Sequence, residues 1–115
     1  MVLSASLRRF LEHAPVVGAT FELDASEDAS EMGAAFQWMD ASQMMAEATE
    51  VYPGVAVVKH GYLPVGMCLE GSGDPYFVRL QDCALVRVLH DADWLQGLQE
   101  EAIETVLPSV FGIGM

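Results

Sequence analysis

Histidine and cysteine are the side chains of this sequence with the greatest capacity for catalysis or metal binding. The three histidines, His13, His60 and His90, are widely separated, and Cys68 and Cys83 lie fifteen positions apart. Zinc sites use short ligand spacings such as Cys-x-x-Cys or His-Glu-x-x-His, and neither occurs here. A site built from both cysteines and one histidine across paired strands is geometrically possible, but isolated thiols are more often small core residues. We therefore expect reduced thiols, no metal and no cofactor.

A second possibility for chemistry is an acid–base cluster formed by His90 with Asp91 and Asp93. Capping of a following helix explains these aspartates more simply. No nucleophile, base and orienting group can be assembled from the sequence. We expect a protein that is not an enzyme, in which His90 makes a structural hydrogen bond.

The segment EGSGDP, residues 70–75, is rich in glycine and lies between two strand-like runs. It lacks the GxxxxGK[ST] and GxGxxG patterns, and no helix follows to complete a phosphate site. Glu70 and Asp74 would also repel phosphate. We interpret the segment as a hairpin connection in which Gly71 or Gly73 adopts a positive φ.

Charge is the most unusual property of the chain, which has seventeen acids, five Lys or Arg and a net charge of −12. Residues 14–58 contain eight acids and no base, and residues 91–115 contain five acids and no base. This distribution argues against binding to nucleic acid or to an anionic membrane, which require positive patches. A basic protein partner would be attracted, although improved solubility is an equally good explanation.

Hydrophobic periodicity and turn signals predict the following elements. A helix over 4–15, with Ser4 as N-cap and Pro15 as its end, precedes a strand over 19–23 and an acidic loop over 24–33. A strand over 33–39 leads to a helix over 41–51 capped by Asp40. Strands are predicted over 55–69, with a break at Gly61, and over 75–80 and 83–90. A last helix begins near Asp91 or Asp93 and ends before Pro108.

Consecutive strands with short connections pair antiparallel, and helices grouped around such a sheet make an α+β domain. We predict a single domain over residues 1–115 with a central, mostly antiparallel sheet and flanking helices. No apolar run is long enough to span a bilayer, and no secretion signal is present, so we expect a cytoplasmic location.

Several of these patterns together resemble the SUKH superfamily, which includes fungal cell-wall assembly regulators and bacterial toxin-immunity proteins. The similarity covers about residues 33–107: FQWMDASQMM, then GYLPVG, then GSGDPYFVRL, then VRVLHD and a terminal helix. The family's fold agrees with the predicted elements. The positions that match the family pattern are Trp38, Leu63, Pro64, Gly66, Gly71, Gly73, Asp74, His90 and Asp91. An unusually acidic segment over 22–31 departs from the pattern.

The resemblance implies an immunity protein that neutralises a cognate toxin, such as a basic nuclease, by direct binding. An acidic secretion chaperone that binds an effector segment as a homodimer is the alternative. Met39, Met44 and Met45 could then serve adaptable binding, although filling of the core is the simpler explanation of these methionines. The candidate partner-binding residues are Asp24, Glu27, Asp28, Glu31, Glu70 and Asp74. The first four belong to a segment with no local cation, Glu70 and Asp74 are secondary candidates, and all six are expected on the surface presented to the partner.

Overall fold

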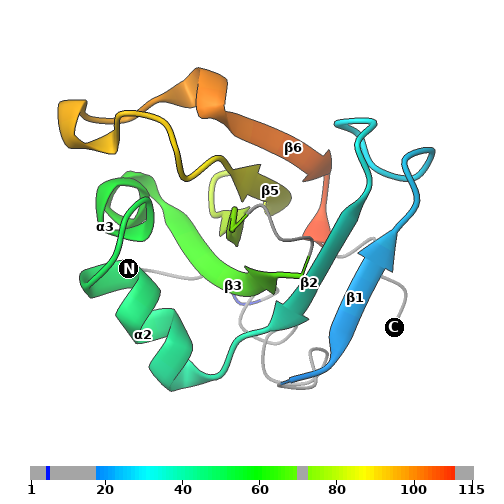
Figure 1. Ribbon diagram of the computed structural model, residues 1–115, viewed down its shortest axis with the longest axis horizontal. Coiled ribbons are helices and arrows are strands. Elements are labelled where there is room, and N and C mark those ends of the chain that lie inside the picture. Colours follow the sequence, from blue (N-terminus) through cyan, green and yellow to red (C-terminus); the bar gives the residue numbers. More distant parts are fainter. Residues whose placement is uncertain (1–4, 6–17, 70–72, 111–115) are drawn as a thin grey trace.

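The computed structural model describes residues 5, 18–69 and 73–110, and within them six strands form one antiparallel sheet (Figure 1). Each strand pairs with the next one in the sequence, in the order β1-β2-β3-β4-β5-β6. The strands are β1 Thr20–Leu23, β2 Ala34–Trp38, β3 Tyr62–Cys68, β4 Tyr76–Arg79, β5 Ala84–Val88 and β6 Ile103–Leu107. Together with its helices this sheet makes an α+β domain, as predicted.

The helices connect β2 to β3 and β5 to β6. They are α2 Ala41–Thr49, α3 Gly54–Val57 and the 3-10 turns η1 Val58–His60, η2 Trp94–Gln96 and η3 Glu100–Ala102. Asp40 caps α2 as predicted: Asp40 Oδ1 accepts the Gln43 N–H at 2.7 Å, and Gln43 Oε1 accepts the Asp40 N–H at 2.9 Å. This reciprocal pair satisfies two donors that a helix start would otherwise leave unpaired.

The sheet is curled, so that the loop between β1 and β2 reaches the far strand β6. The Ala29 N–H donates to the Val106 carbonyl at 2.8 Å. Figure 1 shows this loop, in cyan, beside β6, in orange. The curl therefore brings the acidic loop next to a strand that lies more than seventy positions later.

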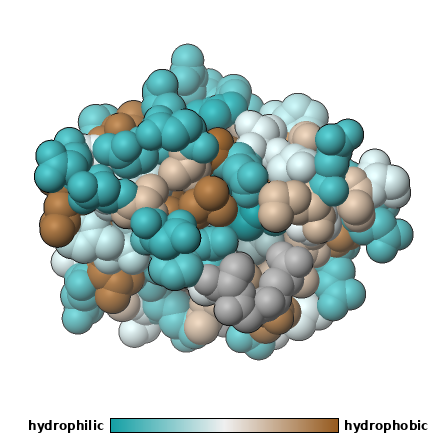
Figure 2. Space-filling view, turned by 45° about the horizontal axis from the view of Figure 1, so that its top comes forward, coloured by the Kyte–Doolittle hydropathy of each residue, from teal (hydrophilic) through white to brown (hydrophobic). Residues whose placement is uncertain are grey.

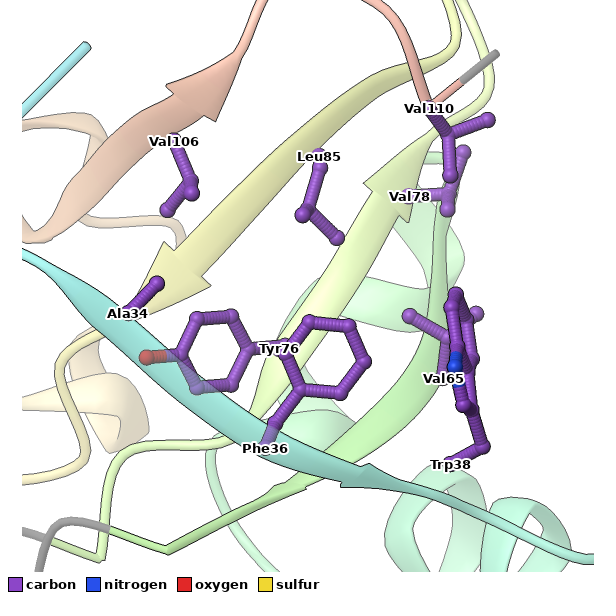
Figure 3. Packing of buried hydrophobic residues seen from close by; sticks show 9 residues of the cluster. All are labelled: Ala34, Phe36, Trp38, Val65, Tyr76, Val78, Leu85, Val106 and Val110. Carbon is purple, nitrogen blue, oxygen red and sulfur yellow. The ribbon is translucent and has the colours of Figure 1, made fainter. Parts of the chain in front are cut away.

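Two clusters of buried side chains lie on the two faces of the sheet. Along β4 and β5 the side chains alternate between them, because successive residues of a strand point to opposite faces. The first cluster, in Figure 3, contains Ala34, Phe36, Trp38, Val65, Tyr76, Val78, Leu85, Val106 and Val110. The second contains Ala56, Val57, Tyr62, Phe77, Ala84, Val86, Val88, Trp94 and Ala102. Helix α3 and the segment around η2 cover the second face.

The prediction of one strand over 55–69 is wrong for its first part, because residues 54–60 are helical. A short apolar run such as VAVV does not distinguish a buried helix from a buried strand. Ala56 and Val57 are buried from α3 beside Tyr62 of β3. Gly61, at φ +88°, then turns the chain into β3.

The prediction of a last helix is also wrong, since residues 103–107 form β6 paired antiparallel with β5. Ile103, Thr105 and Val106 are β-branched and suit a strand. Gly97 adopts φ +117°, which no helix can accommodate. Asp93 makes no side-chain capping bond, so the capping role expected at this helix start is absent as well. Of the helix predicted over 4–15, only Ala5 is described.

Candidate partner-binding surface

Arg87 of β5 lies inside the molecule and joins three strands of the sheet. It is 3% exposed and points to the face that carries Tyr76. Its Nε donates to Glu104 Oε1 of β6 at 3.1 Å, and its Nη1 donates to the Tyr76 hydroxyl of β4 at 3.2 Å. Arg87 and Glu104 are also register partners across β5 and β6, the arrangement in which opposite charges stabilise a sheet.

The same guanidinium holds the acidic loop, residues 24–33. Arg87 Nη1 donates to the Gly33 carbonyl at 2.9 Å, and Nη2 donates to Ser30 Oγ at 2.7 Å. Asp28 Oδ2 lies 3.7 Å from Nη1. Asp28 Oδ1 accepts bonds at 2.7 Å from both the N–H and the hydroxyl of Ser30. The loop conformation is thus fixed by charge-assisted contacts to the sheet.

Burial would lower the pKa of the Arg87 guanidinium, but its hydrogen bonds to Tyr76 and Glu104 outweigh burial and raise that pKa. Arg87 therefore stays charged at every pH at which the protein is folded. A buried cation of this kind stabilises the fold only while its partners are present.

The structure corrects the expectation that all the candidate acids are exposed. Asp24, Glu27 and Glu31 are exposed on the acidic loop. Asp28 is 3% exposed and contacts Arg87, so it is not a surface charge and does have a nearby cation. Sequence reasoning missed this contact because Arg87 lies far along the chain. Glu70 lies outside the described residues.

Within residues 18–69 and 73–110, the other two cations, Lys59 and Arg79, are outnumbered by the exposed acids. Arg79 pairs with Asp82 at 2.9 Å, and their hydrogen bond raises the pKa of Arg79 and lowers that of Asp82. Of the Lys and Arg residues in the described part of the chain, only Lys59 is exposed. Figure 2 shows a face covered largely by hydrophilic residues, in teal, with separate hydrophobic residues in brown among them.

One acid from a distant part of the sequence lies beside the acidic loop. Because the Ala29 N–H bonds to the Val106 carbonyl, the loop lies against β6, which carries Glu104, the ion-pair partner of Arg87. Met32 of the acidic loop is 65% exposed.

Asp74 does not belong to this surface. It is 9% exposed, and its Oδ1 accepts the His90 N–H at 2.9 Å and lies 2.6 Å from His90 Nδ1. The pair ties the segment before β4 to the end of β5, which agrees with the structural hydrogen bond expected of His90. Asp91, the next residue, is exposed.

Backbone conformation or packing in the core explains other described residues of the family pattern. Gly73 adopts φ +80°, as predicted for the hairpin connection, while Gly71 lies outside the described residues. Gly66 passes the Phe36 ring so closely that an added Cβ would lie 2.3 Å from Cδ2. Trp38 packs edge-on against Phe36 with ring centroids 4.9 Å apart. Pro64 is buried in β3, beside an irregularity in its register with β4.

Cys68 and Cys83 are both free thiols, at opposite ends of the hairpin that β3 and β4 form. Cys68 pairs with Phe36, whereas the Cys83 N–H bonds to Arg79 in the turn before β5. Within residues 18–69 and 73–110, no three His, Cys, Asp or Glu side chains converge to hold a metal ion.

Two hollows border α2. One, of about 250 Å³, is apolar and lies between the helix and β3; its lining residues are Ala41, Met44, Met45, Ala48, Leu63 and Pro64. The other, of about 240 Å³, contains one acid; its lining residues are Met39, Glu47, Met67, Cys68, Gly73 and Pro75. We call them the methionine groove and the Glu47 hollow. The sequence pattern predicted neither of them.

No protein-family model matches the chain, and searches of curated proteins and of solved structures also return no significant match. In the part of the chain that the structure describes, every helix is too short or too polar to cross a membrane.

Proposed function

We propose that this chain is a binding protein for a basic protein partner, and that it acts in the cytoplasm as an immunity protein that neutralises a toxin. One observation carries the proposal: Arg79 and Arg87 are both engaged within the fold, so neither of these arginines neutralises the exposed acids of the loop, Asp24, Glu27 and Glu31. Arg87 is buried and Arg79 is paired with Asp82. The similarity of residues 33–107 to SUKH proteins supports the same conclusion.

The acidic surface, which we define as the exposed Asp24, Glu27 and Glu31 of the acidic loop, suits this role in two ways. Its charges attract a basic partner over a distance of about one Debye length, roughly 8 Å at physiological salt, and raise the association rate. The loop that carries Asp24, Glu27 and Glu31 is held by Arg87, so less conformational entropy is lost on binding. A toxin that uses a basic groove to bind nucleic acid would meet acids where it otherwise meets phosphates.

The test uses the products of the reading frames that adjoin this gene. Each is expressed alone and together with this chain, and cell growth and complex formation are measured. We expect one product to arrest growth, this chain to restore it, and a one-to-one complex between folded proteins to form. If no adjacent product is toxic or binds the chain, the proposal is wrong.

The methionine groove favours a second candidate function, the acidic secretion chaperone. Met45 is 63% exposed on α2, and α2 has no buried residue. Flexible methionine side chains suit an extended, variable effector segment. A homodimer of this chain that binds an extended segment of the adjacent product, with no effect on growth, would establish this function in place of immunity.

A further inference from the structure

The Glu47 hollow combines apolar walls with one acid that none of the contacts described above uses. Met39, Met67 and Pro75 supply the apolar part of the lining, from the end of β2, from β3 and from the segment before β4. Glu47 enters from the last turn of α2. A volume of about 240 Å³ is enough for one long side chain and too small for a secondary-structure element.

One of the two carboxylate oxygens of Glu47 is hydrogen-bonded within the fold. Its Oε2 accepts the Gly54 N–H at 3.1 Å. The approach of α3 is so close that a Cβ on Gly54 would lie 1.8 Å from the Glu47 carbonyl oxygen. None of the described Lys or Arg side chains forms an ion pair with Glu47. Burial raises the pKa of Glu47 to about 7, against the opposing effect of the Gly54 N–H, as expected of a carboxylate without a counter-ion.

We propose that the Glu47 hollow receives a lysine side chain of the basic partner, with its ammonium on the Glu47 carboxylate and its methylene stem against Met39, Met67 and Pro75. This inference rests on the proposed function and adds the kind of side chain that the partner inserts. A lysine stem buries readily along apolar surface while its charged end stays paired.

The hydrogen bonding of Glu47 favours lysine over arginine. Because Oε2 already accepts the Gly54 N–H, the two carboxylate oxygens are not equally available. Arginine gains most from a fork that engages both oxygens of a carboxylate, whereas the compact ammonium of lysine needs only one.

Binding of an ammonium favours the charged form of Glu47, so it should strengthen as the pH rises through about 7. The elements that border the hollow carry other titratable groups: Tyr62 and Cys68 are on β3, Asp74 with its partner His90 is in the segment before β4, and Glu50 is the C-cap of α2, while α3 carries none. A variant that changes Glu47 alone separates its effect from theirs.

The test is an NMR titration of the full chain with Nα-acetyl-lysine methylamide at pH 6 and pH 8. We expect saturable shifts of the amides of Gly54, Cys68 and Gly73 at pH 8 and weaker ones at pH 6. E47Q should weaken this binding about fivefold and remove its pH dependence, because it deletes one partly exposed ion pair. The glutamine carbonyl can still accept the Gly54 N–H, so the fold is kept.

Two controls make the result specific. E50Q removes the same charge from the exposed C-cap residue of α2 and should bind like the unchanged protein. The Nζ-acetylated ligand has no charge and should not bind. Equal shifts with E47Q and E50Q, or shifts spread over the acidic surface, would overturn the proposal. Because the probe is a single amino acid, this failure would leave the growth test of the proposed function unaffected.

Discussion

Arg87 and Asp28 face each other inside the protein, with Nη1 and Oδ2 3.7 Å apart and side chains only 4% and 0% exposed. One comes from the fifth strand and the other from the loop after the first. Their contact means that the acidic loop and the sheet share one buried charge network, so the shape of the acidic surface depends on a residue that no partner can reach.

Replacing Arg87 with methionine should lower the free energy of unfolding by about 3–5 kcal/mol, because it leaves Asp28 buried without a counter-charge. Urea denaturation followed by circular dichroism measures the change. R79M is the matched control: Arg79 forms a more exposed pair with Asp82, and its loss should cost about 1 kcal/mol or less. Equal losses for R79M and R87M would contradict the buried network.

The triple variant D24N/E27Q/E31Q neutralises the exposed acids of the loop and should leave the fold intact. It should slow association with the partner identified in the growth test about tenfold at low salt. Stopped-flow measurements across a salt series test both points, and the difference should shrink at high salt. The variant D91N/D93N/E101Q removes three other exposed acids and shows whether position or net charge matters. An unchanged rate for both variants would mean that these acids only add solubility.

Substituting Gly66 by alanine should destabilise the protein by about 1–3 kcal/mol through overpacking, since the new Cβ would meet the Phe36 ring at 2.3 Å. Thermal unfolding measures the loss. If the ring is the cause, the double variant G66A/F36L should be more stable than the sum of the two single changes predicts. Additive effects would place the strain elsewhere.

Glu47 should make stability fall as the pH rises. Its pKa is about 7 in the folded protein against an ordinary value of 4.5, so between these values the folded state binds more protons than the unfolded state. The free energy of unfolding should therefore decrease from about pH 4.5 to 7 and contribute no further slope above that range. Denaturation of the unchanged protein and of E47Q at pH 5 and pH 8 tests this, and E47Q should lose less stability between the two.

Local signals predicted the parts of the fold that depend on neighbouring residues. Asp40 and Gln43 form the capping box of α2 within four positions, and the alternation of Tyr76, Phe77 and Val78 specified a strand. The last strand was missed because β6 is stabilised by pairing with the edge of β5, which no periodicity of residues 103–107 reveals. An apolar spacing at Trp94, Leu98 and Ala102 imitates a helix, yet Gly97 breaks it.

The sequence also indicated the acidic loop as a candidate surface but not which of its acids is buried. Glu27 and Asp28 are neighbouring acids of the same loop, and nothing local in the sequence separates them. Only the position of Arg87, which contacts Asp28, distinguishes the buried acid from the exposed one. Glu47 resembles an ordinary exposed acid of an amphipathic helix. Its one local signal is Gly54, seven positions later, which allows α3 to approach and cover it.

The bond from the Ala29 amide to the Val106 carbonyl has a consequence for hydrogen exchange. Amides of surface loops usually exchange fast, yet this one is protected only while β6 stays docked. The exchange rate of the Ala29 amide therefore reports how often β6 detaches, although Ala29 lies far from β6 in the sequence. If the curled sheet opens as one unit, Ala29 will exchange together with the amides of β6, and the acidic loop will lose its shape at the same moment.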